Sequence, residues 1–178
     1  MKLKLIAIVM ISLVASCGSA PKSPQEFRQS AINGSMGMEK NTFVVRRSLS
    51  DLAKFYQVKS KECLNTTIER EKIIRNPDGG QRKGESSFFV YTPKINYNNK
   101  RLELNVQMKI SGDIVKMQEE PEGGYYVFSA EVSPVDNSQS NVTLYYQKYR
   151  SKNLYEAVQG WSTGKDMKCP DLSKDIVS

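Results

Sequence analysis

The sequence predicts an α+β fold, in which an antiparallel sheet of about five to six strands packs against two helices. Apolar and polar residues alternate with period two through residues 101–110, and apolar residues recur at helical spacing after residues 49 and 153. Turn-forming residues separate the expected strands, which favours hairpins and hence antiparallel pairing. One helix after the first strand and one C-terminal helix can together cover one face of the sheet.

The first strand and the first helix open the predicted domain, which spans residues 42–178. Residues 42–47 are expected to form a short strand. A helix is expected over residues 49–64, because Ser48 and Asp51 match a capping box with a shorter acid. Its buried face is expected to carry Leu52, Phe55, Tyr56 and Cys63.

Two strands are expected next, separated by a strong turn at residues 76–80. Residues 66–74 are rich in β-forming types, but the charged run 69–71 favours an edge or a half-exposed position. Residues 87–95 continue as a strand, and Pro93 is expected to mark its ragged or edge end, since proline cannot donate to a strand ladder.

The clearest element is the strand over residues 101–110. Its apolar residues (Leu102, Leu104, Val106, Met108, Ile110) alternate without a fault against polar ones (Arg101, Glu103, Asn105, Gln107, Lys109). This pattern predicts one face on a core and one face in water.

Two strands and a helix are expected after this element. The strands cover residues 125–132 and 141–149, and the inner face of the first is expected to carry Tyr126, Phe128, Ala130 and Val132. The helix covers residues 153–161, with Leu154, Ala157, Val158 and Trp161 on one face, and Gly160 or Gly164 is expected to end it. This order of elements resembles helix-grip and related domains, including those of an accessory lipoprotein of the outer-membrane barrel-assembly machinery. The resemblance rests on element order and assigns no residue a role.

Residues 1–17 have the pattern of a secretory signal peptide. Lys2 and Lys4 precede an apolar run over residues 5–14, and small residues then lead to Cys17. The run is about half of the roughly 20 residues that a membrane-spanning helix needs.

The stretch Leu13-Val14-Ala15-Ser16-Cys17 resembles the lipobox of bacterial lipoproteins. The resemblance implies that residues 1–16 are removed and that the sulfur of Cys17 is diacylated. Two or three acyl chains hold a protein firmly, whereas one holds it only marginally. Gly18 stands where some lipoproteins carry an aspartate as an inner-membrane retention signal, so the resemblance implies an outer-membrane anchor facing the periplasm. The alternative is an ordinary signal peptide, with Cys17 lost or unmodified.

The segment after the anchor is rich in serine, proline, glycine, lysine and asparagine. Residues 17–41 are therefore expected to form a lipidated, flexible tether. Residues 25–32 have the composition for one or two helical turns, but only against a partner.

Cys63 and Cys169 are the cysteines left after acylation of Cys17. In an oxidising periplasm an even pair is most simply a disulfide, and two buried thiols are the alternative. The chain has no histidine and no Cys-x-x-Cys pair, so no metal site and no cofactor are predicted.

No catalytic residue is predicted. The absence of histidine excludes Ser-His-Asp and Cys-His mechanisms. Ser162 and Lys165 have Ser-x-x-Lys spacing, but they lie at an expected helix end with Gly164 between them, whereas the catalytic pair opens a helix. The acidic run 119–122 lies in an expected turn, which favours solvated charges.

The remaining charge is scattered along the chain. Because residues 1–16 include two lysines and no acid, their removal lowers the formal net charge from +7 to +5. A nucleic-acid partner is not expected, since such proteins concentrate basic residues on one face. These basic residues are expected to be solvated; the alternative is that they attract the protein to anionic lipid or cell-wall polymers.

The sequence thus predicts a non-enzymatic envelope lipoprotein that contacts an envelope protein or the cell wall. Candidate ligand or partner contacts are Tyr125, Tyr145, Tyr149 and Trp161. The alternative is a carrier or sensor of an apolar ligand, held between the sheet and the C-terminal helix. Ordinary cross-strand pairs and core packing also account for these aromatic residues.

Overall fold

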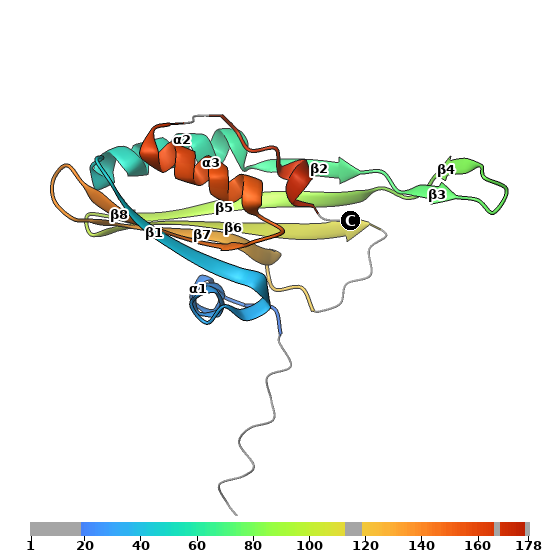
Figure 1. The fold of residues 1–178 in the computed structure, drawn as a ribbon, viewed down its shortest axis with the longest axis horizontal. Helices are drawn as coiled ribbons and strands as arrows, with labels where there is room; N and C mark the ends of the chain where they lie inside the picture. Colours follow the sequence, from blue (N-terminus) through green and yellow to red (C-terminus); the bar gives the residue numbers. More distant parts are fainter. Residues whose placement is uncertain (1–18, 113–118, 166–167, 177–178) are drawn as a thin grey trace, which may run out of the picture.

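The computed structural model describes residues 19–112, 119–165 and 168–176 (Figure 1). Six antiparallel strands form the main sheet in the order β1-β8-β7-β6-β5-β2. Helices α2 and α3 cover one face of this sheet, and α1 lies against the other face (Figure 1). The predicted α+β class is therefore confirmed, with a helix after the first strand and a helix near the C-terminus.

The bounds of the elements are as follows. The main sheet contains β1 (Met38–Val45), β2 (Thr66–Arg70), β5 (Ser87–Asn98), β6 (Arg101–Gly112), β7 (Tyr125–Pro134) and β8 (Ser140–Gln147). The helices are α1 (Pro24–Ile32), α2 (Leu49–Cys63) and α3 (Lys152–Thr163), with 3-10 helices η1 (Ser35–Gly37) and η2 (Leu172–Asp175). A separate two-stranded sheet contains β3 (Ile73–Arg75) and β4 (Gln81–Lys83).

The core lies between the main sheet and helices α2 and α3. Alternate residues of β6 supply it, and Leu102, Leu104 and Val106 are all fully buried. Helix α2 begins as the capping box predicts, since the Ser48 hydroxyl accepts a hydrogen bond from the Asp51 amide at 3.1 Å. In β6 and α2 the period of the sequence therefore predicts which side faces this core.

The middle of the polar face of β6 is not in water, so that expectation is wrong for Glu103, Asn105 and Gln107, whereas Arg101 and Lys109 are exposed. Asn105 and Gln107 are 2% and 1% exposed, and Glu103 is half-buried. Helix α1 lies against this side of the sheet, which we call the α1 face, and its Arg28 makes hydrogen bonds to Asn105 and Glu103. Arg28 thus supplies partners for Glu103 and Asn105 from a distant segment, whereas Gln107 donates to the backbone oxygens of Glu122 and Gly124 in the turn before β7.

Helix α1 belongs to the segment that was predicted to be a tether. It begins at a cap, where the Ser23 hydroxyl accepts from the Glu26 amide at 3.2 Å, and it buries Phe27 and Ala31. Residues 25–32 were expected to form helical turns only against a partner, and that packing partner is the sheet of the same chain. In the structure, ordered packing starts as early as Ala20, which is 6% exposed, and well before the predicted boundary at residue 42.

A β-bulge in β7 changes the predicted inner face of that strand. Gln107 pairs with Tyr126 and Val106 pairs with Phe128, so Val127 is an extra residue. Side chains alternate along a strand, and one inserted residue moves those before it to the other face. Tyr126 therefore packs with Phe27 of α1 and not on the inner face, as was predicted.

The strand predicted over residues 66–74 is two strands. The first part, β2, pairs with β5, whereas the second part, β3, pairs with β4 and extends away from the main sheet (Figure 1). The predicted turn between β3 and β4 is confirmed, since the Asn76 amide donates to Gly80 O at 2.8 Å. Residues of this hairpin are mostly exposed, because it packs against no core.

The C-terminal segment ties the two covering helices together. The predicted disulfide between Cys63 and Cys169 is confirmed and joins the end of α2 to this segment. Gly164, with φ of 73°, ends α3 in the left-handed conformation that glycine adopts at no steric cost. Among the residues described, no helix is both long and apolar enough to cross a membrane.

Candidate functional site: an open strand edge beside helix α2

Half of strand β5 has an open edge. Strand β2 pairs with β5 from Arg70↔Ser87 to Thr66↔Tyr91, and no described strand continues this pairing along residues 92–98 of β5. The reason is local, because the chain ends α2 at Cys63 and reaches β2 only at Thr66. The open edge exposes backbone donors and acceptors, as any unpaired strand edge does.

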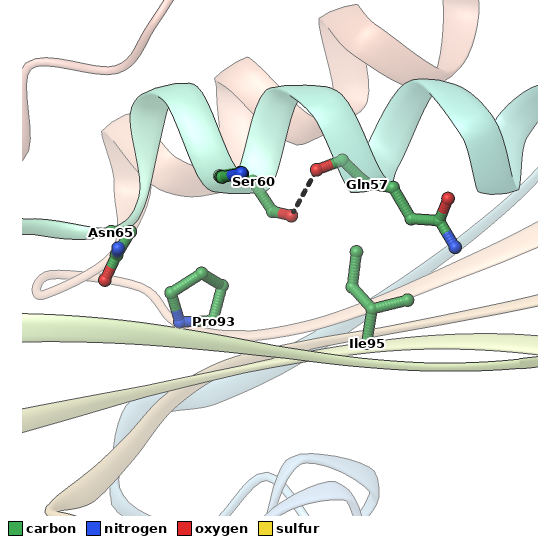
Figure 2. A pocket seen from close by; sticks show the side chains of 6 residues that line it. Gln57, Ser60, Asn65, Pro93 and Ile95 are labelled. Carbon is green, nitrogen blue, oxygen red and sulfur yellow. Dashed lines mark hydrogen bonds between the residues drawn. The ribbon is translucent and has the colours of Figure 1, made fainter.

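A hollow of about 300 Å³ lies between this edge and α2 (Figure 2). It is lined by Gln57, Ser60 and Lys61 of α2, by Asn65, and by Pro93 and Ile95 of β5. One wall of the hollow is therefore the edge of β5, with the apolar side chains of Pro93 and Ile95, and the opposite wall is the polar side of α2.

The polar groups of the hollow differ in how they are engaged. The hydroxyl of Ser60 donates to the backbone oxygen of Gln57 at 3.4 Å (Figure 2). The side-chain amides of Gln57 and Asn65 make no hydrogen bond to any residue that the structure describes, and both residues are exposed. Each amide can both donate to and accept from a ligand backbone.

Two residues limit what can pair with this edge. Pro93 has no backbone N–H, and Lys94 places a charge beside it, and both are devices that discourage indiscriminate strand pairing. The sequence signal here was Pro93, which was predicted to mark the ragged or edge end of its strand. It does lie on the open part, but β5 runs on to Asn98 rather than ending near it.

The aromatic residues predicted as contacts do not come together. Tyr149 is 73% exposed in the turn after β8, and Tyr125 is half-buried at the start of β7. Tyr145 is buried beneath α1, where its hydroxyl donates to Glu131 at 2.7 Å. None of these residues lines the hollow beside α2.

Trp161 is part of the core and is fully buried. Its indole N–H donates to the backbone oxygen of Lys168 at 2.9 Å, so its polar atom is satisfied within the chain. Trp161 lines neither the hollow beside α2 nor a second hollow beside Arg101 and Glu131.

A polar cluster on the α1 face is the largest group that sequence reasoning missed. The guanidinium of Arg28 donates to Glu131 at 2.6 Å and to Ser129 at 3.0 Å, and it is 3.2 Å from Glu103. Arg101 forms ion pairs with the same two glutamates. Glu103 and Glu131 are thus shared between Arg28 and Arg101, which indicates that the ion pairs of Arg28 hold α1 against the sheet.

A second cluster joins β1 to α3 on the opposite face. The rings of Tyr146 and Tyr155 stack with centroids 4.1 Å apart, and Tyr155 accepts from Asn41 at 2.7 Å. Tyr146 donates to Glu39 at 2.8 Å, and Lys148 pairs with the same carboxylate at 3.0 Å. The Tyr146 hydrogen bond is the main cause that lowers the pKa of Glu39.

The residues considered for catalysis and metal binding are placed as follows. The buried Ser162 hydroxyl donates to Val158 O at 2.6 Å and lies 2.6 Å from the Tyr56 hydroxyl, while Lys165 is exposed beyond the end of α3. Within the described ranges, no group of three or more histidine, cysteine or acidic residues is placed to hold a metal ion.

Comparison with models of known protein families gives no match, and comparison with curated proteins gives none either. The site is therefore interpreted from its own geometry.

Proposed function

We propose that this chain is an exported, lipid-anchored envelope protein without catalytic activity, and that its domain binds an extended segment of another envelope protein. The observation that carries the binding part is the open edge of β5 beside the hollow under α2. The lipobox-like stretch ending at Cys17 supports the anchor. The disulfide between Cys63 and Cys169 supports export, since disulfides persist in oxidising compartments.

Strand addition is the mode of binding that the edge favours. An extended peptide that pairs with residues 92–98 gains main-chain hydrogen bonds, and adjacent pockets select its alternate side chains. Ile95 offers an apolar contact, and the amides of Gln57 and Asn65 offer hydrogen bonds from above. Pro93 and Lys94 restrict the register and the charge of the peptide.

The alternative function, a carrier of an apolar ligand beneath the C-terminal helix, has less support. Such a carrier needs an enclosed cavity of several hundred Å³ lined by apolar side chains. Trp161 is packed in the core, and the hollow beside α2 is open and lined mostly by polar residues. The geometry therefore favours an interaction module.

Acylation is tested with a Cys17→Ser variant in cells fed a labelled fatty acid. We expect the wild-type protein to incorporate label and to fractionate with membranes, and the variant to do neither. A wild-type protein without label, or a variant that is processed and retained as before, contradicts the anchor. Unchanged incorporation in a Cys63→Ser variant is the control for cysteine specificity.

The binding edge is tested by site-specific photo-crosslinking in intact cells. A photoreactive residue at Gln57 is expected to give a discrete adduct, whereas one at Val58, which is exposed on α2 outside the hollow, is not. Asn65→Arg places a bulky charge at the rim and should reduce the Gln57 adduct at least fivefold. Thr67→Arg, an exposed position on β2, is the matched control.

The pattern of adducts decides the outcome. Equal adducts from Gln57 and Val58, or a Gln57 adduct that Asn65→Arg leaves unchanged, would place the partner elsewhere and overturn the proposed edge.

A further inference from the structure

We propose that the α1 face of the domain rests on a leaflet of anionic lipid, with Lys40, Lys94 and Lys109 directed at its headgroups. The inference rests on the proposed acylation of Cys17. It adds the orientation of the domain and the kind of lipid that the domain recognises.

The first argument is the length of chain between the anchor and the fold. Ala20 is 6% exposed, and only residues 18 and 19 separate it from Cys17. An extended chain spans at most about 3.6 Å per residue, so acylated Cys17 lies within about 11 Å of Ala20. The tether expected over residues 17–41 is thus reduced to a short link, and the surface at the start of α1 is held close to the bilayer.

The second argument is the side of the sheet on which the chain enters. The described chain begins on the side of α1, and α2 and α3 lie on the opposite face (Figure 1). A link of about 11 Å is too short to reach the opposite face, since the layer of α1 alone is about 10–12 Å thick and the sheet lies beyond it. The α1 face is therefore the face presented to the membrane.

The third argument is the set of charges on this face. Side chains of directly paired residues in neighbouring strands lie on the same face. Lys40 is paired with Tyr145 and Lys94 with Asn105, and both partners lie on the α1 face. Lys109 follows the same alternation two residues after Gln107, whose side chain faces that side.

These lysines are available to a ligand. All three are exposed, and none has an acidic partner in the parts of the chain that the structure describes. The glutamates at the centre of the face, Glu103 and Glu131, are already paired with arginines. Further acids near this side are Glu26, which accepts from the Lys22 amide, Glu69 at the far strand β2, and Glu122, whose backbone oxygen accepts from the Gln107 side chain.

Exposed apolar side chains accompany the lysines. Ile32 is 51% exposed at the end of α1, Val44 is 58% exposed, and Phe88 is 39% exposed. Val44 and Phe88 are on the α1 face by the same pairing, opposite Asn141 and Ser111. Basic and apolar residues together are typical of surfaces that lie at a membrane interface.

The orientation leaves the proposed binding edge accessible. The hollow is roofed by α2, on the face of the sheet that points away from the lipid. A partner segment can therefore reach β5 while the α1 face remains against the leaflet.

The test uses the acylated full chain on vesicles and follows thiol labelling. In this chain Cys63 and Cys169 are joined, so with Cys17 acylated an engineered cysteine is the reactive thiol. Thr92→Cys probes the α1 face, because Thr92 is exposed and paired with Gln107. Val58→Cys, exposed on α2, is the matched control.

Labelling with a charged, membrane-impermeant maleimide is compared on two kinds of vesicle. One contains phosphatidylethanolamine and phosphatidylglycerol, and the other contains phosphatidylcholine alone. We expect Thr92→Cys to be labelled at least fivefold more slowly on the anionic vesicles, and Val58→Cys to be labelled at the same rate on both. Basic residues near anionic lipid each strengthen binding by about fivefold, so three of them suffice for this difference.

Charge variants then distinguish lipid binding through the α1 face from electrostatic attraction of the protein as a whole. The combined changes Lys40→Gln, Lys94→Gln and Lys109→Gln should abolish the protection of Thr92→Cys. The same number of changes on the opposite side, Lys54→Gln, Lys152→Gln and Lys165→Gln, should leave it intact. Equal effects of both triple variants overturn the proposed face.

Two failures can be told apart. A protein that carries fatty acid and sediments with both vesicles, but shows equal labelling at Thr92 and Val58 or equal protection on both lipids, overturns this inference and leaves the anchor standing. A protein without fatty acid that stays in the supernatant with phosphatidylcholine vesicles overturns the anchor, and this inference with it.

Discussion

Arg28 of α1 donates a hydrogen bond to Glu131 of β7 at 2.6 Å, although 103 residues separate them in the chain. A helix of nine residues is too short to be stable alone in water, so its folding depends on such tertiary contacts. Burying Arg28 to 6% exposure is tolerated because the two glutamates and the polar side chains of β6 and β7 satisfy its guanidinium.

Replacing Arg28 with methionine should therefore destabilise the domain and release α1. The variant keeps the aliphatic stem but leaves Glu103 and Glu131 with Arg101 alone, and the loss of one partner of a buried ion pair costs about 3 kcal/mol. Urea unfolding measures this loss, and limited proteolysis should show new cleavage in residues 24–37. Gln29→Met on the exposed side of α1 is the control. An unchanged unfolding midpoint for Arg28→Met would contradict the proposed role of the Arg28 ion pairs in holding α1 against the sheet.

Asp175 caps α3 from another part of the chain. It is 4% exposed and accepts from the amides of Asn153 and Leu154 at 2.9 and 3.0 Å, whereas the hydroxyl of the N-cap residue Ser151 makes no capping bond. Asp175→Ala should lower the free energy of unfolding by about 1–2 kcal/mol, the usual range for a lost N-cap. Thermal unfolding followed by circular dichroism provides the measurement.

Asp171→Ala is the matched control for this variant, because Asp171 is exposed and caps only the 3-10 helix η2 through Ser173. If both variants unfold at the same temperature as the wild type, Asp175 contributes no capping energy.

The disulfide should account for much of the stability of the domain. It joins residues 106 apart, and the chain-entropy model gives about 4–5 kcal/mol for a loop of this length. We expect a Cys63→Ala, Cys169→Ala double variant to unfold at a correspondingly lower urea concentration, and the unreduced wild-type protein to run faster on a denaturing gel than the reduced protein. Equal mobility, together with two titratable thiols, is the result that rules out the bond.

Glu39 makes the stability of the β1–α3 contact depend on pH. Its folded pKa lies below the ordinary value of 4.5, chiefly because Tyr146 donates to it and secondly because Lys148 does. The stabilisation is therefore complete above the unfolded pKa and is lost as the pH falls through the folded pKa. The difference in unfolding free energy between wild type and Glu39→Gln should be constant above about pH 6 and should shrink below 4.5.

Glu85→Gln serves as the control for this titration, because Glu85 is exposed between β4 and β5 and has no such contacts with the described residues. A Glu39→Gln difference that stays constant down to pH 3 would mean that the carboxylate does not hold Tyr146.

The elements that sequence predicts best are those whose signal is local. Helix α2 follows from the capping box at Ser48 and from apolar residues at helical spacing, and β6 follows from its alternation. The turn before β4 follows from the Asn-Pro-Asp-Gly-Gly stretch, and the disulfide follows from cysteine count. Each of these depends on neighbouring residues or on composition alone.

The binding edge could be predicted only in part. Pro93 was predicted to mark the ragged or edge end of its strand, but the strand continues to Asn98, and its open edge begins where β2 stops pairing, at Thr66↔Tyr91. The hollow also needs α2 to lie over the edge, which depends on the packing of Leu52 and Tyr56 into the core. Neither the length of the open edge nor the position of α2 over it is encoded in a local sequence pattern.

The sequence by itself determined the fold class, the inward side of most elements, the turns and the cysteine pair, because hydrophobic periodicity and backbone chemistry act over a few residues. Only the tertiary structure decided that the segment around Arg28 is a folded helix, that Tyr126 lies on the α1 face, and that β5 is half open. These features arise where residues about 20 to 100 positions apart meet, and the free energy that fixes them comes from burial and ion pairing that exist only after the sheet has assembled.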